Sequence, residues 1–256
     1  MSDAAETPPP EVPPMEFHKP KPIHNWREFL KEYAIIVLGV ATALAAEQAV
    51  EAVHNLERAA QARTSIRAEI ADNIALINRR TDTEGCVSRR LNEVESLIRT
   101  PAAGSQAPVW IGHPPNWLMT RDQYTAAAQS GAVSLLSNLE QVSYSLIYSA
   151  TEDYSQAEKS EQAAWADLRM LELHPAATPV LDGLLRSALQ KARNARWQTE
   201  ISARVARTGV AALGIKTDKK PRFPQTSACI PLNTTREEGE KLVVKGRPGN
   251  FAYDEP

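Results

Sequence analysis

Glycine and aromatic residues are scarce in this chain, which has 11 glycines and only 6% aromatic residues among its 256 positions. Strands are enriched in aromatic and β-branched residues, and glycine supplies many of the tight turns that join them. Alanine, which has the highest helix propensity, is abundant instead. The length suffices for one large or two small domains. We therefore expect an all-α protein.

The chain also lacks an excess of charge of either sign. Its 29 basic and 31 acidic residues leave a formal net charge of −2. Domains that bind nucleic acid usually concentrate lysine and arginine in a basic patch, and no such block is visible here. We expect no nucleic-acid partner.

Recognisable catalytic motifs are absent as well. The sequence contains no G-x-S-x-G elbow, no Walker loop, no H-E-x-x-H motif and no dinucleotide-binding glycine pattern. None of its five histidines stands at metal-ligand spacing from another histidine or from a cysteine. We expect no catalytic residue, no metal and no cofactor, and we interpret the chain as a non-enzyme. An envelope enzyme with an unrecognised site remains an alternative.

Only two cysteines are present, Cys86 and Cys229. Disulfides form in oxidising compartments and are rare in the cytoplasm. The two residues are therefore candidate disulfide partners if this part of the chain lies outside the cytoplasm. The alternative is a pair of unrelated free thiols.

Residues 33–46 form an apolar stretch that contains no charge and no proline, and six of its residues are isoleucine, valine or leucine. At about 1.5 Å per residue it spans about 21 Å, and the aromatic and basic lead-in from Trp26 extends it to roughly 30 Å, the thickness of a bilayer core. The pattern predicts a transmembrane helix within residues 24–48. Its predicted membrane-anchor residues are Tyr33, Ile35, Ile36, Val37, Leu38, Gly39, Val40 and Leu44.

The distribution of basic residues predicts the orientation of this span. Lys19, Lys21, Arg27 and Lys31 precede it, and the first basic residue after it is Arg58. Basic residues near a span are retained in the cytoplasm. We expect the N-terminus in the cytoplasm and the C-terminal domain outside it, anchored in the inner (cytoplasmic) membrane.

Two other interpretations of this stretch stay open. The small-residue triplet at residues 43–45 resembles a signal-peptidase site, which would make the protein secreted after cleavage. The stretch also has a length that suits a buried helix of a soluble bundle. If it does span the membrane, Gly39 and Ala43 form a small-x-x-x-small pair, a candidate helix–helix contact for a homo-oligomer.

The rest of the chain divides by composition. Residues 1–22 are proline-rich and predict a disordered cytoplasmic tail. Residues 49–215 predict an antiparallel bundle of about four helices, the first of which continues from the span as a coiled-coil-like stalk. Residues 216–256 lack a helical period and predict an irregular C-terminal extension, in which residues 241–245 form at most a short strand.

Apolar residues at spacings of three and four mark the predicted buried side of each helix. On the first helix they are Val50, Val53, Leu56, Ala60, Ile66, Ile70, Ile74 and Ile77. A second helix is expected over residues 85–99, and a third begins at Asn116 and breaks at Gly131. On the helix expected over residues 137–173 the stripe is Leu139, Val142, Leu146, Ala150, Ala157, Ala164, Leu168 and Leu171. On the helix expected over residues 179–213 it is Leu181, Leu184, Leu185, Ala188, Ala192, Ala195, Ile201 and Val205.

Residues 24–215 resemble a broad group of uncharacterised bacterial single-pass membrane proteins. The resemblance lies in the lead-in and span NWREFLKEYAIIVLGVATALAAEQAVEAVHNLE, in RAEIADNIALINRR with its Glu69–Asn73 pattern, and in the later block QYTAAAQSGAVSLLSNLEQVSYSLIYSATEDY. It implies a membrane-anchored helical domain of unknown function and supplies no active site.

These patterns predict a structural or protein-interaction role in the cell envelope. The expected partners are the lipid bilayer and either a second copy of the chain or another envelope protein. A ligand-sensing helical bundle is the main alternative.

Overall fold

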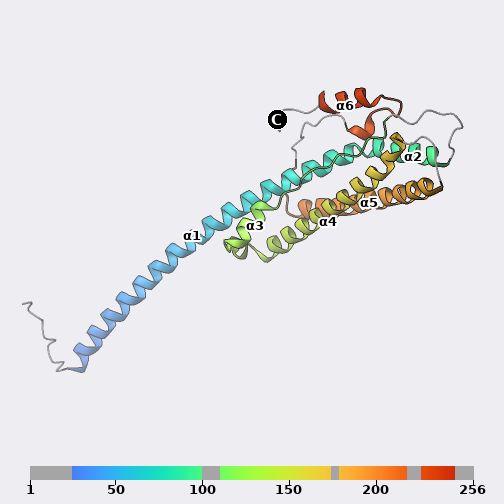
Figure 1. The fold of residues 1–256 in the computed structure, drawn as a ribbon. Helices are drawn as coiled ribbons and strands as arrows, with labels where there is room; N and C mark the ends of the chain where they lie inside the picture. Colours follow the sequence, from blue (N-terminus) through green and yellow to red (C-terminus); the bar gives the residue numbers. More distant parts are fainter. Residues whose placement is uncertain (1–24, 100–109, 174–178, 218–225, 246–256) are drawn as a thin grey trace, which may run out of the picture. The chain divides into compact units, whose positions relative to one another are not determined.

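The computed structural model describes residues 25–99, 110–173, 179–217 and 226–245, and within these ranges the protein is all-α, as predicted (Figure 1). The predicted tail over residues 1–22 lies outside the described residues. The described part contains six α-helices rather than about four, because two short helices accompany the four long ones. The α-helices are α1 (Trp26–Asp82), α2 (Glu84–Arg99), α3 (Asp122–Gln129), α4 (Asn138–Leu168), α5 (Pro179–Ala212) and α6 (Arg236–Lys245). The 3-10 helices are η1 (Ala132–Leu135), η2 (Arg169–Glu172) and η3 (Ser227–Cys229).

The chain divides into two compact units, Met1–Val53 and His54–Pro256. The first unit contains the N-terminal part of α1, where an 18-residue window has a mean hydropathy of 1.7 and no buried residue. In the described part of the chain, this is the one helix long and apolar enough to cross a membrane, a criterion that a signal sequence near an N-terminus also meets. The rings of Trp26, Phe29 and Tyr33 stack along it, with centroids 5.6 and 6.2 Å apart.

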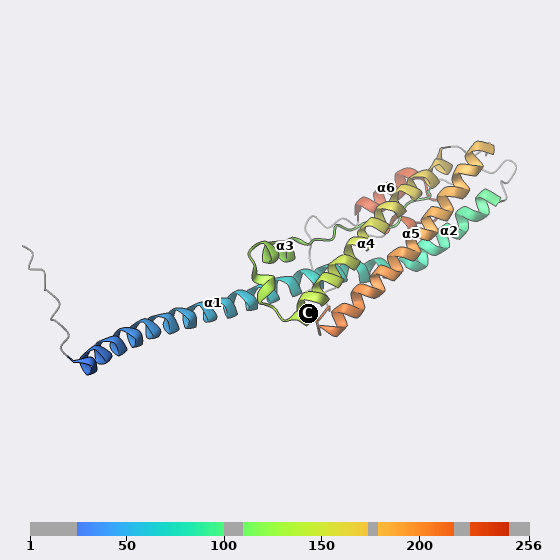
Figure 2. The same cartoon turned by 90° about the horizontal axis from the view of Figure 1, so that it is seen from below.

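The second unit has two hydrophobic cores. The first joins the C-terminal half of α1 to α3, η1, α4 and the end of α5, and it contains the predicted stripe Ile66, Ile70, Ile74 and Ile77. The second joins α2, the end of α4, the start of α5 and η3 around Trp165. Helices α4 and α5 contribute to both cores and run antiparallel beside each other (Figures 1 and 2).

Local signals define the start of α4 and the end of α5, which lie beside each other in the antiparallel pair. Ser137 caps α4 in a capping box with Glu140, which satisfies backbone donors of the first turn. Gly214 adopts φ +60° just after the end of α5, at the stop that the sequence predicted. Gly209 lets the helices approach closely, since a Cβ there would lie 2.6 Å from Cγ1 of Ile147.

Part of the predicted buried stripe of α4 is wrong. Leu139, Val142 and Leu146 are 70%, 68% and 50% exposed, whereas Tyr144 and Ile147 are fully buried. Helix α4 has two apolar sides at helical spacing, and periodicity does not say which one meets a neighbour. Contact with α1 and α5 selects the side that carries the bulky tyrosines. The same correction applies to Val50, Val53, Leu56 and Ala60 of α1 and to Leu184, Ile201 and Val205 of α5, all exposed.

The third helix begins at Asp122 rather than at Asn116, so Trp117 lies on a non-helical segment. Contacts with α1 determine this start. Asn73 exchanges two hydrogen bonds with the main chain of Thr120, at 2.8 and 3.1 Å. The Glu69 carboxylate accepts hydrogen bonds from the backbone N–H groups of residues 123 and 124, at 3.1 and 3.3 Å. A carboxylate from another helix thus satisfies the N-terminus of α3.

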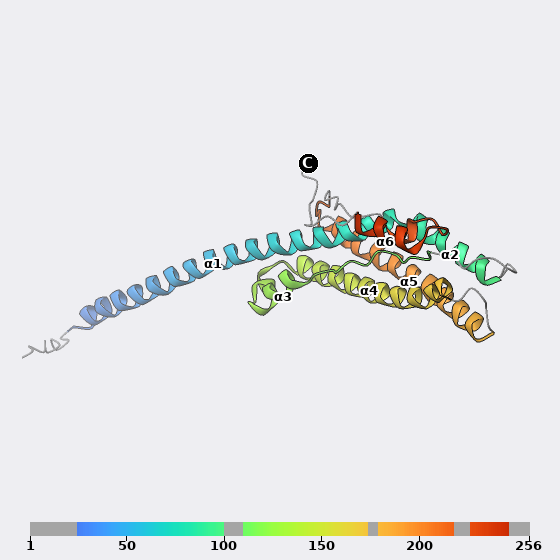
Figure 3. The same cartoon turned by 45° about the horizontal axis from the view of Figure 1, so that its top comes forward.

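The described C-terminal residues are ordered around a disulfide between Cys86 of α2 and Cys229 of η3. Buried Arg90 donates hydrogen bonds to the carbonyl oxygens of Trp110, Ile111 and Ile230, which ties three segments together. Residues 236–245 form α6 near α2 (Figure 3), where the sequence analysis expected an irregular extension or a short strand.

Candidate functional site

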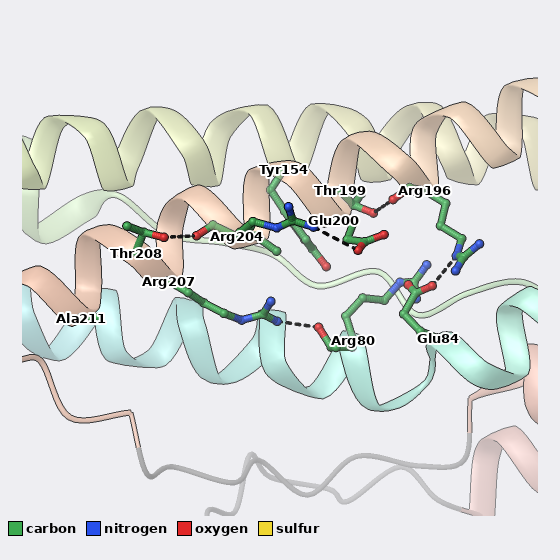
Figure 4. A pocket seen from close by; sticks show the side chains of 12 residues that line it. Arg80, Glu84, Tyr154, Arg196, Thr199, Glu200, Arg204, Arg207, Thr208 and Ala211 are labelled. Atoms are coloured by element: carbon green, nitrogen blue, oxygen red, sulfur yellow. Dashed lines mark hydrogen bonds and ion pairs between the residues drawn. The ribbon is translucent and has the colours of Figure 1, made fainter.

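A buried ion-pair network lies where α1 meets α2, α4 and α5 (Figure 4). Arg80, at the end of α1, is 2% exposed and donates to both carboxylate oxygens of Glu161 on α4, at 3.0 Å each. It also pairs with Glu84 of α2, whose other oxygen binds Arg196 of α5. The network therefore links four helices through two guanidinium and two carboxylate groups.

The junction between α1 and α2 holds Arg80 in place. Thr83 is the one residue between the two helices, and its backbone N–H and its hydroxyl both donate to the Arg80 carbonyl oxygen, at 3.0 and 2.7 Å. A basic residue in the last helical turn also interacts favourably with the helix dipole. The tight connection leaves the Arg80 side chain pointing at α4.

Burial and neighbouring charges have opposite effects on the pKa values of Arg80 and Glu161. Burial disfavours the charge of Arg80, but Glu161 and Glu84 outweigh it, so the pKa of the guanidinium is raised. Burial also raises the pKa of Glu161, while Arg80 opposes that change. Breaking such a pair leaves one uncompensated buried charge, which costs more than the intact pair contributes.

Two further buried groups lie next to the network on α4. Burial raises the pKa of Glu158 to about 8, and the charge of Arg80, the main chain at Trp117 and the Tyr154 hydroxyl offset this effect only in part. The offsets are weak because neither carboxylate oxygen of Glu158 has a hydrogen-bond partner of ordinary geometry in the described residues. Burial likewise raises the pKa of Tyr154 well above its ordinary value. At neutral pH both groups are neutral.

A groove of about 520 Å³ opens above this network, between α5 and the α1–α2 junction (Figure 4). Helix α5 supplies most of its wall through residues one turn apart. The lining residues are Arg80, Thr81, Glu84, Tyr154, Arg196, Thr199, Glu200, Ala203, Arg204, Arg207, Thr208 and Ala211. Arg80 and Tyr154, both 2% exposed, form its floor.

On the α5 side of the groove, Arg196 is paired with Glu84, but the charges of Arg204 and Arg207 are not fully neutralised. Arg207 donates to neutral oxygens, those of the Asn78 amide at 2.9 Å and the Thr81 hydroxyl at 2.6 Å. Arg204 meets Glu200 at 3.5 Å, and both side chains are largely exposed, so this pair contributes little. The groove thus offers guanidinium groups that are free to bind an anion.

The described residues contain no group of three histidine, cysteine or acidic residues placed to hold a metal ion. The polar side chains that line the groove are mainly hydrogen-bond donors, which suits the binding of a ligand that carries acceptors.

The residues singled out from sequence lie elsewhere. Cys86 and Cys229 are joined to each other but do not line the groove. The anchor residues and Ala43 are exposed, and Gly39 has open space around it.

The groove and its ion-pair network were not predicted from the sequence. Charged residues on helices usually face solvent, so Arg80 and Glu161 attracted no attention. One signal was available: Tyr154, Glu158 and Glu161 recur at spacings of four and three beside the buried alanines of α4. No protein-family model, curated protein or solved structure matches this chain.

Proposed function

We propose that this protein is a single-pass protein of the inner (cytoplasmic) membrane whose helical domain lies outside the cytoplasm and has a structural or protein-interaction role in the cell envelope. The main observation that supports this proposal is the 18-residue apolar window of α1, in which no residue is buried. A core helix of a soluble bundle would be mostly buried. Six strong apolar residues contribute about −2 to −3.5 kcal/mol on insertion, which favours a membrane helix by a small margin.

The disulfide supports the proposed orientation independently of the positive charges before the span. Cys86 and Cys229 both lie C-terminal to the apolar window, and their pairing suits an oxidising compartment. The excess of basic residues at positions 19–31 favours a cytoplasmic N-terminus. Two unrelated properties therefore favour the same topology.

Exposed apolar side chains on the helical domain support an interaction role. On α4 they recur at Leu139, Val142 and Leu146, and on α5 at Trp197 and Ile201. Apolar residues exposed in rows, rather than singly, are typical of surfaces that bind other proteins. We propose a second copy of the chain or another envelope protein as the partner.

Membrane fractionation of the full chain tests the anchor. We expect the protein to resist an alkaline wash and to keep its N-terminus, as measured by intact mass. Leu38→Arg places a charge in the span at a cost of about 2.5–3.5 kcal/mol, which cancels the insertion energy and should release the protein. Leu56→Arg, at an exposed site outside the window, is the matched control and should remain in the membrane.

Two results would contradict the proposal. A soluble protein that begins near Ala46 would show that the stretch is a signal peptide. A soluble and uncut protein would show that it does not anchor the chain at all. Spheroplasts are cells whose outer layers have been removed. Protease added to intact spheroplasts should digest the helical domain. Protection of that domain would show that the protein has the opposite orientation in the membrane.

A further inference from the structure

We propose that the groove between α5 and the α1–α2 junction binds a small organic oxyanion, a carboxylate or a phosphate ester, through Arg204 and Arg207. This inference goes beyond the proposed function and does not depend on the membrane topology. It would give the domain a ligand as well as a partner.

The charge of the groove selects an anion. Four arginines and two glutamates line it. Glu84 is already shared between Arg80 and Arg196, so it is neutralised within the network. Arg207 has neutral acceptors, and its guanidinium keeps its full charge. Arginine presents a planar set of donors that matches the oxygens of carboxylate and phosphate groups.

The floor of the groove holds donors that lack a partner. The Tyr154 hydroxyl and Nε of Arg80 are buried, and neither has a hydrogen-bond partner of ordinary geometry in the described part of the chain. Buried polar groups are normally satisfied, so such atoms at the base of a groove indicate a missing acceptor. Glu158, near Tyr154, is protonated at neutral pH and adds no negative charge against an anion.

The size and the walls of the groove indicate an organic ligand. A space of about 520 Å³ is within the range of small-molecule sites and exceeds the need of inorganic phosphate alone. Ala203 and Ala211 present methyl groups, and Thr199 and Thr208 lie on the same wall. A charged group with a short carbon body would use both kinds of surface.

Isothermal titration of the full chain in mild detergent tests the proposal. The probes are glycerol 3-phosphate and succinate, each against sodium chloride of the same ionic strength. We expect saturable binding of at least one probe at one site with a Kd below about 1 mM, the weak end of specific binding. Binding of the phosphate alone or of the dicarboxylate alone supports the proposal and identifies the oxyanion class. Absence of saturable binding of both up to 10 mM, the highest concentration to be titrated, would overturn it.

Variants locate the site. Arg204→Gln, at an exposed residue, should weaken binding about tenfold, the effect of one charge-assisted hydrogen bond. The matched control is Arg186→Gln, which removes an exposed arginine of the same helix outside the groove and should leave the Kd unchanged. Equal loss in both variants would show general charge attraction and overturn the site.

Tyr154→Phe tests the floor separately. It removes one hydroxyl and keeps the ring, so circular dichroism should show an unchanged helix content. We expect binding to weaken about fivefold, as for one neutral hydrogen bond. An unchanged Kd would show that the ligand does not reach Tyr154 and would overturn the assignment of the floor.

Discussion

Replacing Glu158 by glutamine should change how the stability of the protein depends on pH. The carboxyl group is buried on α4, and burial raises its pKa to about 8. The charges that face it are Arg80 of α1 and Glu161 of its own helix, with the Tyr154 hydroxyl nearby. Glutamine is a neutral side chain of nearly the same shape as the protonated acid.

The direction in which stability changes with pH depends on whether the folded or the unfolded chain binds the Glu158 proton more tightly. In the unfolded chain Glu158 loses its proton near pH 4.5, whereas the folded chain keeps it up to about pH 8. The contribution of Glu158 to stability is therefore fully present below pH 4.5 and is lost as pH rises to about 8. The difference between the two pKa values corresponds to about 5 kcal/mol, and relaxation around the charge should reduce this to roughly 2–3 kcal/mol.

Urea unfolding of the full chain in mild detergent, followed by circular dichroism between pH 5 and pH 8.5, measures the effect. The wild-type protein should lose about 2–3 kcal/mol more than Glu158→Gln over this range, the value expected after relaxation around the charge. The variant should match the wild type at pH 5 and exceed it at pH 8.5. Glu152→Gln, an exposed site on the same helix, should behave like the wild type. Parallel pH profiles for the wild type and Glu158→Gln would refute the reasoning.

Three further predictions concern stability. Cys86→Ser opens a disulfide between residues 143 positions apart and should lower the free energy of unfolding by roughly 2–5 kcal/mol in urea; a wild-type protein equally stable with and without reductant would contradict this. Glu69→Gln weakens the hydrogen bonds that order the start of α3 and should cost about 1.5–3 kcal/mol, with faster hydrogen exchange at residues 123 and 124; unchanged exchange there would count against it. Ile147→Ala should lower the free energy of unfolding by about 2–5 kcal/mol, whereas the neighbouring Leu146→Ala should change it by less than about 0.5 kcal/mol. Thermal unfolding of both variants measures the difference. A larger loss for Leu146→Ala would show that the other side of α4 is buried.

The helices were predictable because their signals are local. Propensity, capping residues and apolar spacing act within one or two turns, so the ends of α2 and α5 lie within one residue of the prediction. The stripe from Ile66 to Ile77 was predicted for the same reason. The start of α3 was not, because the groups that determine it, Glu69 and Asn73, lie about 50 residues earlier in the chain.

The sequence by itself determined the all-α class, the apolar window of α1 and the presence of just two cysteines. Only the tertiary structure decided which side of α4 is buried, and that Arg80 meets Glu161, 81 residues later. It also assembled the groove, from side chains of α1, α2, α4 and α5. Helical periodicity describes the faces of one helix, whereas an ion pair or a groove depends on how several helices pack, and packing brings together residues that no local pattern relates.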